Sequence, residues 1–448
     1  MIGVCGGAVA GSEAAALVAD RGAVAVVFEQ NTRPYGKIED GLPRWHVKLR
    51  QKEYERIDEN LAKPNVIYVP CTRVGEHFGF GELVERWRLS ALVLANGAWR
   101  DRPFPVPGVD DYVGCGLLYQ NPFVYWFNHY EDPGYGGPHY EVPDGTIVVG
   151  GGLASIDVVK IVNLELYGRA LRARGIEVDM VSLEHAGIDK TLADHGLTPE
   201  SLGVRGCTLF YRRRREDMPL ASADDPTPEV LAKLQKARVK IMEKVERKYL
   251  VGVEELAVPR APIAEGGRLR GLVFRRSELV DGRVREVEGS DFEVRADLVV
   301  SSIGSIPEPI EGVPMTGELY RFENQTTGEL EGMMGVYGLG NVLTGKGNIK
   351  DSRSSAGVVA AHVLDTFLAG GDAQARERTS SVVSEAIHDE TAEKAAEVVG
   401  RALEERRLST DEIASLFDRI ATRWNAVGYA GDYRAWMAEH GPSDRVAF

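Results

Sequence analysis

A strand, a glycine-rich turn and a helix follow one another twice in this chain of 448 residues. The segment IGVCGGAVAGSEAA opens the chain, and TIVVGGGLASIDVV recurs near residue 147, so that Gly6 and Gly150 begin the two turns. Such a turn lets backbone amides and a helix N-terminus approach a pyrophosphate. Two copies predict an α/β chain with two dinucleotide-binding, Rossmann-like domains.

Later strand signals predict how the two domains share the chain. The strand LSALVLANGAW ends in a turn at Asn96 and Gly97, and the proline-rich DRPFPVPG after it disfavours helix. A comparable strand and turn, ADLVVSSIGSIPEP, follows the second repeat. We therefore expect the second domain to be inserted into the first. The first domain would comprise residues 1–108 and 302–448, with a helical C-terminal extension, and the second would comprise residues 109–301.

Local patterns predict several further elements. Apolar spacing and charge content predict helices over residues 229–248 and 380–420. The segments RLRGLVFRRSELV and SDFEVRADLVV have the composition of strands.

The first turn has the features of an FAD site. Gly6, Ala8 and Gly11 form a G-x-G-x-x-G-like pattern in which alanine, common in flavoproteins, takes the second position. The strand VAVVFEQ then ends at Glu29, about 20 residues further on, where a carboxylate accepts hydrogen bonds from ribose hydroxyls. The alternatives are an ordinary tight turn and a solvated glutamate at the end of a strand.

The second turn has the features of an NADP site. Gly150, Gly152 and Ser155 form the turn, and the strand GCTLFY leads into four consecutive arginines, residues 212–215. NAD sites place a carboxylate against the ribose 2′-hydroxyl, whereas NADP sites place arginine against the 2′-phosphate. Guanidinium groups give bidentate bonds to phosphate, so the sequence favours NADPH. The alternative is a solvated run of charge.

Composition excludes other classes of protein. The formal net charge of −14 argues against general nucleic-acid binding. The apolar runs are too short to span a membrane, and no targeting segment is recognisable, so we expect a cytoplasmic protein. The cysteines form no CxxC pair, and no metal-binding motif is present, so we expect no metal site and four small buried thiols: Cys5, Cys71, Cys115 and Cys207.

Beyond these patterns, the chain resembles the adrenodoxin reductase family, which includes bacterial ferredoxin–NADP reductases. The resemblance rests on RPYGKIEDGLPRWHVKLR, FVYWFNHYED and the closing YAGDYRAWMAEHGPSDRVAF. The segment YRRRREDMP is also similar to the NADPH-binding subunit of glutamate synthase, although this chain has no counterpart of that subunit's cysteine-rich domain. The family's flavin-closing region matches only loosely. Asn341 stands where related flavoproteins often carry aspartate, and the usual tryptophan is missing.

The resemblance implies hydride transfer from NADPH to FAD, followed by one-electron transfer to an iron–sulfur protein such as ferredoxin. It makes His46 the best catalytic candidate and Glu229 a weaker one, although a lone histidine is more often structural. The residues expected to bind the two cofactors are Gly6, Ala8, Gly11, Ser12, Glu29, Gly36, Lys37, Asn96, Gly97, Gly150, Gly152, Leu153, Ala154, Ser155, Arg212, Arg213, Gly304, Gly340, Asn341, Asn348 and Ile349.

Three functions remain open from the sequence. The first is a free-standing reductase of ferredoxin-like carriers, and the second is a flavin-bearing subunit of a larger redox assembly. A reductase of quinones or other small molecules is less favoured. An acidic protein repels an acidic ferredoxin unless its charges are segregated, and the predicted helix at 229–248 is rich in basic residues. That helix contains more basic than acidic residues. The basic ones are Lys233, Lys236, Arg238, Lys240, Lys244, Arg247 and Lys248, and the acidic ones are Glu229, Glu243 and Glu246. A solvated helix with local ion pairs is the alternative to a docking surface.

Overall fold

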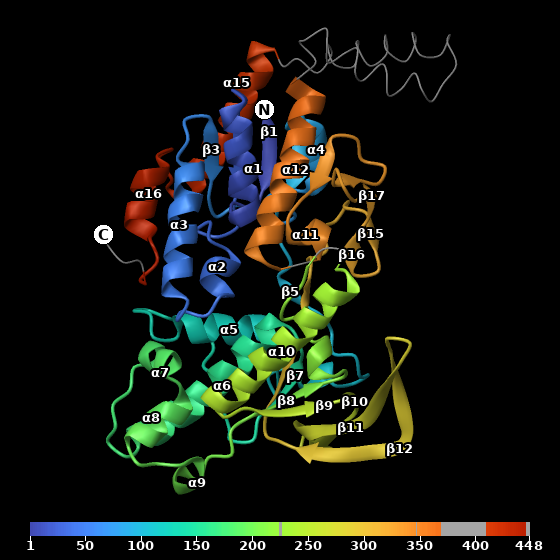
Figure 1. Ribbon diagram of the computed structural model, residues 1–448. Coiled ribbons are helices and arrows are strands. Elements are labelled where there is room, and N and C mark those ends of the chain that lie inside the picture. Colours follow the sequence, from blue (N-terminus) through green and yellow to red (C-terminus); the bar gives the residue numbers. More distant parts are fainter. Residues whose placement is uncertain (224–225, 346, 369–408, 445–448) are drawn as a thin grey trace. The chain divides into compact units, whose positions relative to one another are not determined.

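The computed structural model describes all residues except 224–225, 346, 369–408 and 445–448 (Figure 1). The chain divides into two compact units. Unit 1 comprises Met1–Ile38, Lys48–Trp99 and Ile306–Phe448, and unit 2 comprises Glu39–Val47 and Arg100–Ser305. The expected domain limits at 108/109 and 301/302 stay a prediction. One feature that the sequence did not indicate is that residues 39–47 belong to unit 2.

Unit 1 contains a seven-stranded sheet in the order β17-β18-β19-β4-β1-β2-β3. The strands from β19 to β3 are parallel, and β17 and β18 pair antiparallel beside them. Their bounds are β1 (Ile2–Cys5), β2 (Ala25–Phe28), β3 (Val66–Val69), β4 (Ala91–Leu94), β17 (Phe322–Asn324), β18 (Glu329–Leu330) and β19 (Val336–Gly338). The apolar runs of β1, β2 and β4 are typical of parallel strands that are covered on both faces.

Helices cover this sheet because alternate strand residues point to opposite faces. Val27 and Val93 pack with one group of helices, in which α1 and α12 lie side by side (Figure 1). Phe28 and Leu94 pack into a second core on the other face. The helices and short strands of unit 1 are α1 (Val9–Asp20), α3 (Val47–Leu61), α4 (Phe80–Arg86), α11 (Asn341–Thr344), α12 (Ile349–Leu368), α15 (Thr410–Val427), α16 (Tyr433–His440), β15 (Met315–Thr316) and β16 (Leu319–Tyr320), and α2 (Lys37–Asp40) leads from unit 1 into unit 2.

Unit 2 contains a five-stranded parallel sheet in the order β6-β13-β7-β8-β9. Val148 packs against helices on one face, and Val149 packs against a three-stranded antiparallel sheet, β10-β11-β12, on the other. The strands are β5 (Arg100–Asp101), β6 (Leu117–Tyr119), β7 (Ile147–Gly150), β8 (Thr208–Tyr211), β9 (Gly252–Glu255), β10 (Ala257–Glu265), β11 (Arg268–Val280), β12 (Arg283–Arg295), β13 (Val299–Ser302) and β14 (Ser305–Ile306). The helices are α5 (Gln120–His129), α6 (Leu153–Arg172), α7 (Met180–Ala186), α8 (Ile188–Asp194), α9 (Pro199–Leu202) and α10 (Pro228–Tyr249), with short 3₁₀ turns η1 (Asp110–Tyr112) and η2 (Arg215–Asp217).

The structure confirms the predicted α/β class with two parallel sheets. The helix predicted over residues 229–248 is α10, and the two predicted strand segments form β11, β12 and β13. Most of the helix predicted over 380–420 lies outside the described residues, and its last part falls in α15. None of the described helices is long and apolar enough to cross a membrane.

The prediction of four buried cysteines is wrong for two of them. Cys5 and Cys207 are buried, whereas Cys71 is half-buried and Cys115 is exposed. Cys115 is exposed because it lies in the turn just before β6 rather than in a strand or a helix face.

Candidate functional site

The first glycine turn is shaped by close backbone packing. Gly6 has a φ of +102°, and a Cβ atom there would lie 2.6 Å from the Ala95 carbonyl oxygen. A Cβ atom on Gly11 would lie 1.8 Å from the Gly6 carbonyl oxygen. Both positions therefore require glycine. Helix α1 begins directly after Ala8, which has no side chain to cap it, so the first amides of α1 are open to a ligand.

Glu29 is buried, with 4% of its surface exposed, and is not the solvated strand-end residue considered as an alternative. Its carboxylate accepts hydrogen bonds from the backbone N–H of Gly7 at 2.8 Å and of Asn31 at 2.9 Å. It therefore ties the end of β2 to the glycine turn. An ionised carboxylate has about four acceptor positions, so the same group can also serve ribose hydroxyls.

Two further loops meet the first turn. One loop follows β4 and contains Asn96 and Gly97, and the other follows β19 and contains Gly340 and Asn341. Because β4 and β19 run parallel to β1, their carboxyl ends bring both loops to the same edge of the sheet as the first turn. Gly340 has a φ of +69°, and its Cβ atom would lie 2.8 Å from the Cβ of Ala10. The loop after β19 therefore passes directly over the start of α1.

A lysine and a tryptophan lie beside the same turn. A Cβ atom on Gly36 would approach the Cβ of Ala8 to 2.9 Å and the Trp99 ring to 3.7 Å. The Lys37 ammonium group lies 5.7 Å from the centre of the Trp99 ring. The sequence did not single out Trp99, whose ring lies next to Gly36 and Lys37.

Two expected cofactor residues have structural roles for their side chains. The Ser12 hydroxyl is buried and donates to the Val9 carbonyl at 3.4 Å. The Asn348 side chain accepts from the Asp351 amide at 2.8 Å and donates to the Asp351 carboxylate at 2.7 Å. Asn348 thus caps α12, whose first residue is Ile349. Cofactor contacts by these three residues stay a prediction.

The second turn contains one glycine that the protein itself does not require. A Cβ atom on Gly150 would lie 2.3 Å from the Ser302 carbonyl oxygen, and one on Gly151 would lie 2.2 Å from the Tyr211 ring. Gly152, in contrast, has an ordinary φ of −91°, and apart from its two chain neighbours no described residue has a heavy atom within 4 Å of its Cβ position. The open space beside Gly152 leaves room for a ligand to approach the backbone.

Helix α6 begins at this open space. Leu153 is 56% exposed and Ala154 is also exposed, and their first-turn amides have no partner within the helix. Ser155 is fully buried and donates to the Ser302 carbonyl at 2.9 Å, which anchors α6 to β13. Gly304, with a φ of +107°, follows β13 at the same edge of the sheet.

The tertiary structure divides the four arginines into two pairs. Arg215 bonds the carboxylate of Glu255, and Arg214 contacts Glu216 at 2.9 Å and Asp217 at 3.4 Å. These two guanidinium groups are therefore engaged within the turn after β8.

The other two arginines are less engaged. Arg212 is exposed and forms no ion pair with any described residue. Arg213 lies 3.7 Å from Asp217, and its Nε atom is buried without a hydrogen-bond partner in the described chain. The two residues follow Tyr211, whose ring packs against the glycine turn, so both lie in the chain segment that leaves β8 next to that turn.

The two predicted catalytic residues have different surroundings. The Nε2 atom of His46 lies 3.8 Å from the Asp157 carboxylate on α6. Glu229 is exposed in the first turn of α10, and no described contact joins it to the glycine turn or to Arg212. The sequence analysis missed Asp157, although it stands two residues after Ser155 in the second repeat.

No protein-family model matches the chain. The glutamate synthase (NADPH) small chain of Mycobacterium tuberculosis is 25% identical over 380 residues, which are 83% of this chain and 67% of that protein. The mitochondrial NADPH:adrenodoxin oxidoreductase of Arabidopsis thaliana is 22% identical over 331 residues, 66% of this chain and 65% of that protein. The structure of Mycobacterium tuberculosis FprA in complex with NADPH matches with a TM-score of 0.65 at 21% identity, covering 94% of this chain and 90% of FprA.

Each glycine turn lies at the carboxyl edge of its own sheet, so the fold is that of a protein with two dinucleotide-binding units. The chain is similar to an adrenodoxin oxidoreductase and to glutamate synthase small chains. The resemblance inferred from the sequence is thus confirmed.

Proposed function

We propose that this protein is an NADPH-dependent FAD enzyme that passes electrons to a one-electron carrier protein. The observation that carries the proposal is the second turn, where Gly152 leaves open space and Tyr211, which precedes the exposed Arg212, packs against Gly151. NADPH appears in the names of the small chain of glutamate synthase and of the adrenodoxin oxidoreductase to which this chain is similar. The first turn, with Glu29 behind it, fits the diphosphate and ribose of FAD.

The two cofactors, when bound, supply the redox chemistry, and the residues of this chain position them. In unit 1, the amides after Ala8 would hold a pyrophosphate, and Glu29 would hold a ribose. In unit 2, the amides of Leu153 and Ala154 would hold the second pyrophosphate, and Arg212 and Arg213 would hold the 2′-phosphate.

We infer that His46 serves the reaction and that Asp157 holds its imidazole in place. The imidazole is about one third exposed, so it can meet a ligand, and the carboxylate 3.8 Å away limits its orientation. For Glu229, the exposed position on α10 supports a helix-terminal role, because acidic residues stabilise the first turn of a helix. A cytoplasmic location remains part of the proposal.

The first test is spectroscopic. Purified protein should be yellow, and anaerobic addition of NADPH should bleach the flavin absorbance near-stoichiometrically, whereas NADH should act much more weakly. A colourless protein, or a bound flavin that NADPH does not reduce, would disprove the proposal.

The variant Gly152→Ala tests NADPH binding separately from the stability of the fold. Since a methyl group there meets no atom of the described residues beyond its chain neighbours and the φ is ordinary, the melting temperature should be unchanged or slightly higher. The same methyl group should obstruct the pyrophosphate and raise the NADPH concentration for half-maximal flavin reduction by about tenfold, equivalent to ~1.4 kcal/mol. Thermal unfolding and NADPH titration measure the two effects. Unchanged NADPH affinity would remove Gly152 from the binding site.

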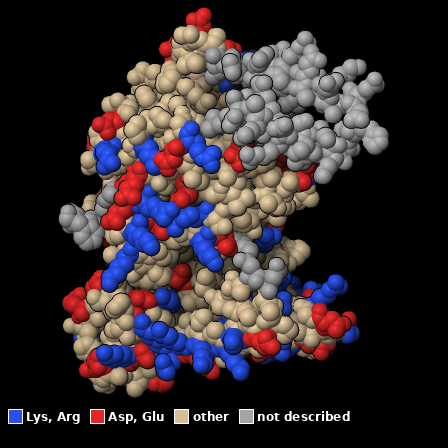
Figure 2. Space-filling view, turned by 45° about the horizontal axis from the view of Figure 1, so that its top comes forward, with Lys and Arg blue, Asp and Glu red and all other residues tan. Residues whose placement is uncertain are grey.

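A row of unpaired basic residues on α10 supports an acidic protein carrier. Along the helix, spacings of three and four residues place the members of the row on one face. All are exposed, and none forms an ion pair with a described residue, which counts against the alternative of local ion pairs. Figure 2 shows that Lys and Arg side chains gather in continuous groups on the face in view, despite the negative net charge. The row consists of Lys233, Lys236, Lys240, Lys244 and Arg247.

Reversing Lys236, Lys240 and Lys244 to glutamate should slow reduction of an acidic ferredoxin by at least about tenfold at low salt, because steering depends on complementary charge. Reduction of a small dye should be unchanged. Steady-state assays of both acceptors at several salt concentrations provide the measurement, and the wild-type ferredoxin rate should fall above roughly 0.15 M salt.

A matched control reverses Arg268, Arg283 and Arg285, which are exposed on β11 and β12, and gives the same net charge. If both triple variants slow ferredoxin equally, net charge and not α10 governs docking. If the rate of ferredoxin reduction changes neither with salt nor in the α10 variant, a partner held by apolar contacts is favoured.

A subunit of a larger assembly is the second candidate, because the glutamate synthase relative is itself named as a small chain. Gel filtration of the purified chain together with the carrier assay separates the two functions. A protein that is reduced by NADPH but passes electrons to dyes only, and that co-purifies with a larger redox partner, fits the assembly.

A further inference from the structure

Residues 39–47, which we call the strap, pack on α5 within unit 2, although the chain on both sides of the strap belongs to unit 1. The Asn128 side chain of α5 holds the strap backbone. Its Nδ2 atom donates to the carbonyls of Glu39 at 2.8 Å and Leu42 at 3.1 Å, and its Oδ1 atom accepts from the Arg44 amide at 3.0 Å. One amide side chain therefore fixes the path of the strap.

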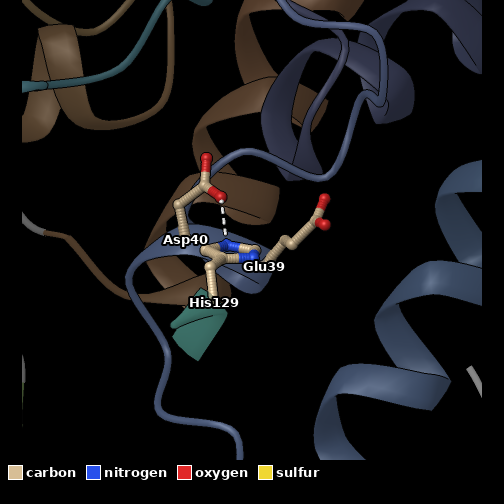
Figure 3. A group of neighbouring side chains, drawn as sticks. All are labelled: Glu39, Asp40 and His129. Atoms are coloured by element: carbon tan, nitrogen blue, oxygen red, sulfur yellow. Dashed lines mark hydrogen bonds and ion pairs between the residues drawn. The ribbon is translucent and has the colours of Figure 1, made fainter. Parts of the chain in front are cut away.

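His129, the next residue of α5, bridges two carboxylates. Its Nε2 atom lies 3.0 Å from Oδ1 of Asp40 in the strap, and its Nδ1 atom lies 2.8 Å from Oδ2 of Asp132. Figure 3 shows the Asp40 carboxylate directed at the imidazole ring, with Glu39 beside it. The ring is only 7% exposed. Because ionised carboxylates only accept hydrogen bonds, this arrangement suits an imidazolium ion that donates from both nitrogens.

Glu39, Asp40 and His129 are close enough to share a cation, since their ligand atoms lie within 4.8 Å of one another. Both nitrogens of His129 already bond carboxylates, however, and a metal would have to displace at least one of these bonds. We therefore assign the cluster to hydrogen bonding and ion pairing.

The strap also carries His46 near its end. The Arg44 guanidinium lies over the rings of Phe127 and Tyr130, at 4.9 and 5.3 Å, and Trp45 packs edge-on against Phe127. His46 follows directly and faces Asp157 at 3.8 Å. The position of the strap on α5 therefore decides where the His46 imidazole stands.

We propose that His129, together with Asn128, is a positioning residue that latches the strap onto α5 and so sets His46 against Asp157. The role of His46 in catalysis rests on the proposed function, whereas the latch itself rests only on the contacts within unit 2.

The latch depends on pH. The charged groups that face His129 are Asp40 and Glu39 from α2 and Asp132 after α5, and the Tyr125 ring packs 4.5 Å from the imidazole. Burial lowers the pKa of His129, but the bonds to Asp40 and Asp132 and the charge of Glu39 outweigh it and raise the pKa above its ordinary value. The stabilisation is therefore complete below the unfolded pKa of about 6.5 and is lost as the pH rises through the higher folded value.

Hydrogen exchange of the strap tests the latch directly. In wild-type protein, exchange of a peptide covering residues 39–46, corrected for its intrinsic rate, should accelerate as the pH passes the folded pKa of His129. In His129→Gln, which can donate to only one carboxylate, exchange should be about tenfold faster at pH 6 and should lose this pH step. The control is His195→Gln, an exposed histidine at the end of α8, which should behave as wild type.

Asp132→Asn provides a second variant in case His129→Gln folds poorly. Removing one of the two acceptor charges should move the pH step to lower pH. Exchange that is equally slow and has the same pH step in wild type, His129→Gln and Asp132→Asn would overturn the latch.

Stopped-flow reduction by NADPH connects the latch to function. The wild-type rate should fall at alkaline pH with the same midpoint as the exchange step, and His129→Gln should lower the rate while retaining FAD. If the strap loosens as expected but wild-type flavin is not reduced by NADPH at any pH, the latch stands and the proposed function fails. If the strap is loosened in His129→Gln but NADPH reduces the flavin at the wild-type rate, the positioning role is wrong.

Discussion

Replacing Gly11 by aspartate is expected to give a colourless protein. The Cβ atom would lie 1.8 Å from the Gly6 carbonyl oxygen, so the turn must open, and the new carboxylate would stand where the FAD pyrophosphate binds. Loss of both the turn geometry and the charge complementarity should reduce the flavin content by more than about tenfold. The ratio of flavin to protein absorbance after purification measures the effect. Stoichiometric FAD in this variant would refute the site.

A pair of variants at Ala8 separates repulsion of the phosphate from damage to the fold. Aspartate and serine are both good N-caps, and Ala8 offers no cap to α1, so each change should preserve or stabilise the helix. Ala8→Asp should nevertheless lose FAD, whereas Ala8→Ser should retain it. Circular dichroism and flavin content distinguish the cases. Equal retention by both would show that no phosphate approaches this turn.

Removing Arg212 and Arg213 together is expected to abolish the preference for NADPH over NADH. Arg212 is exposed without an ion pair in the described chain, and Arg213 is only weakly held by Asp217, so both can turn to a 2′-phosphate. Charge-assisted hydrogen bonds contribute about 1.5–3 kcal/mol each, so the double alanine variant should raise the KM for NADPH by roughly tenfold or more. The KM for NADH should change little, because NADH lacks that phosphate.

Arg214→Ala is the matched control for this experiment. Arg214 belongs to the same run and is partly exposed, but its guanidinium group contacts Glu216 and Asp217. Its removal should leave the ratio of the two KM values as in wild type. Equal loss of affinity for NADPH and NADH in the double variant would show that these arginines do not select the coenzyme.

The sequence by itself determined the two dinucleotide units and their turns. A glycine turn between an apolar strand and a small-residue helix is a local pattern, and the close contacts at Gly6, Gly11 and Gly150 are made within that pattern or with the neighbouring strand. The same holds for Glu29, whose place at the end of β2 follows from the length of one strand–helix–strand unit.

Only the tertiary structure decided which of the four arginines are engaged and which are open. Adjacent residues of identical chemistry cannot be ranked by sequence. Arg215 meets Glu255 from another strand, and the path of the turn decides which arginine reaches the acidic residues that follow the run. The exposed Cys115 is a similar case, since burial depends on the turn in which it lies.

The strap was likewise a tertiary result. Nothing in the local pattern of residues 39–47 shows that they pack with unit 2, or that His46 meets Asp157 and His129 meets Asp40. Local periodicity records which face of an element is apolar, but it does not record which distant side chain completes a hydrogen bond. The two turns can be recognised from a pattern of neighbours in the chain, whereas the strap and its latch depend on side chains that only folding brings together.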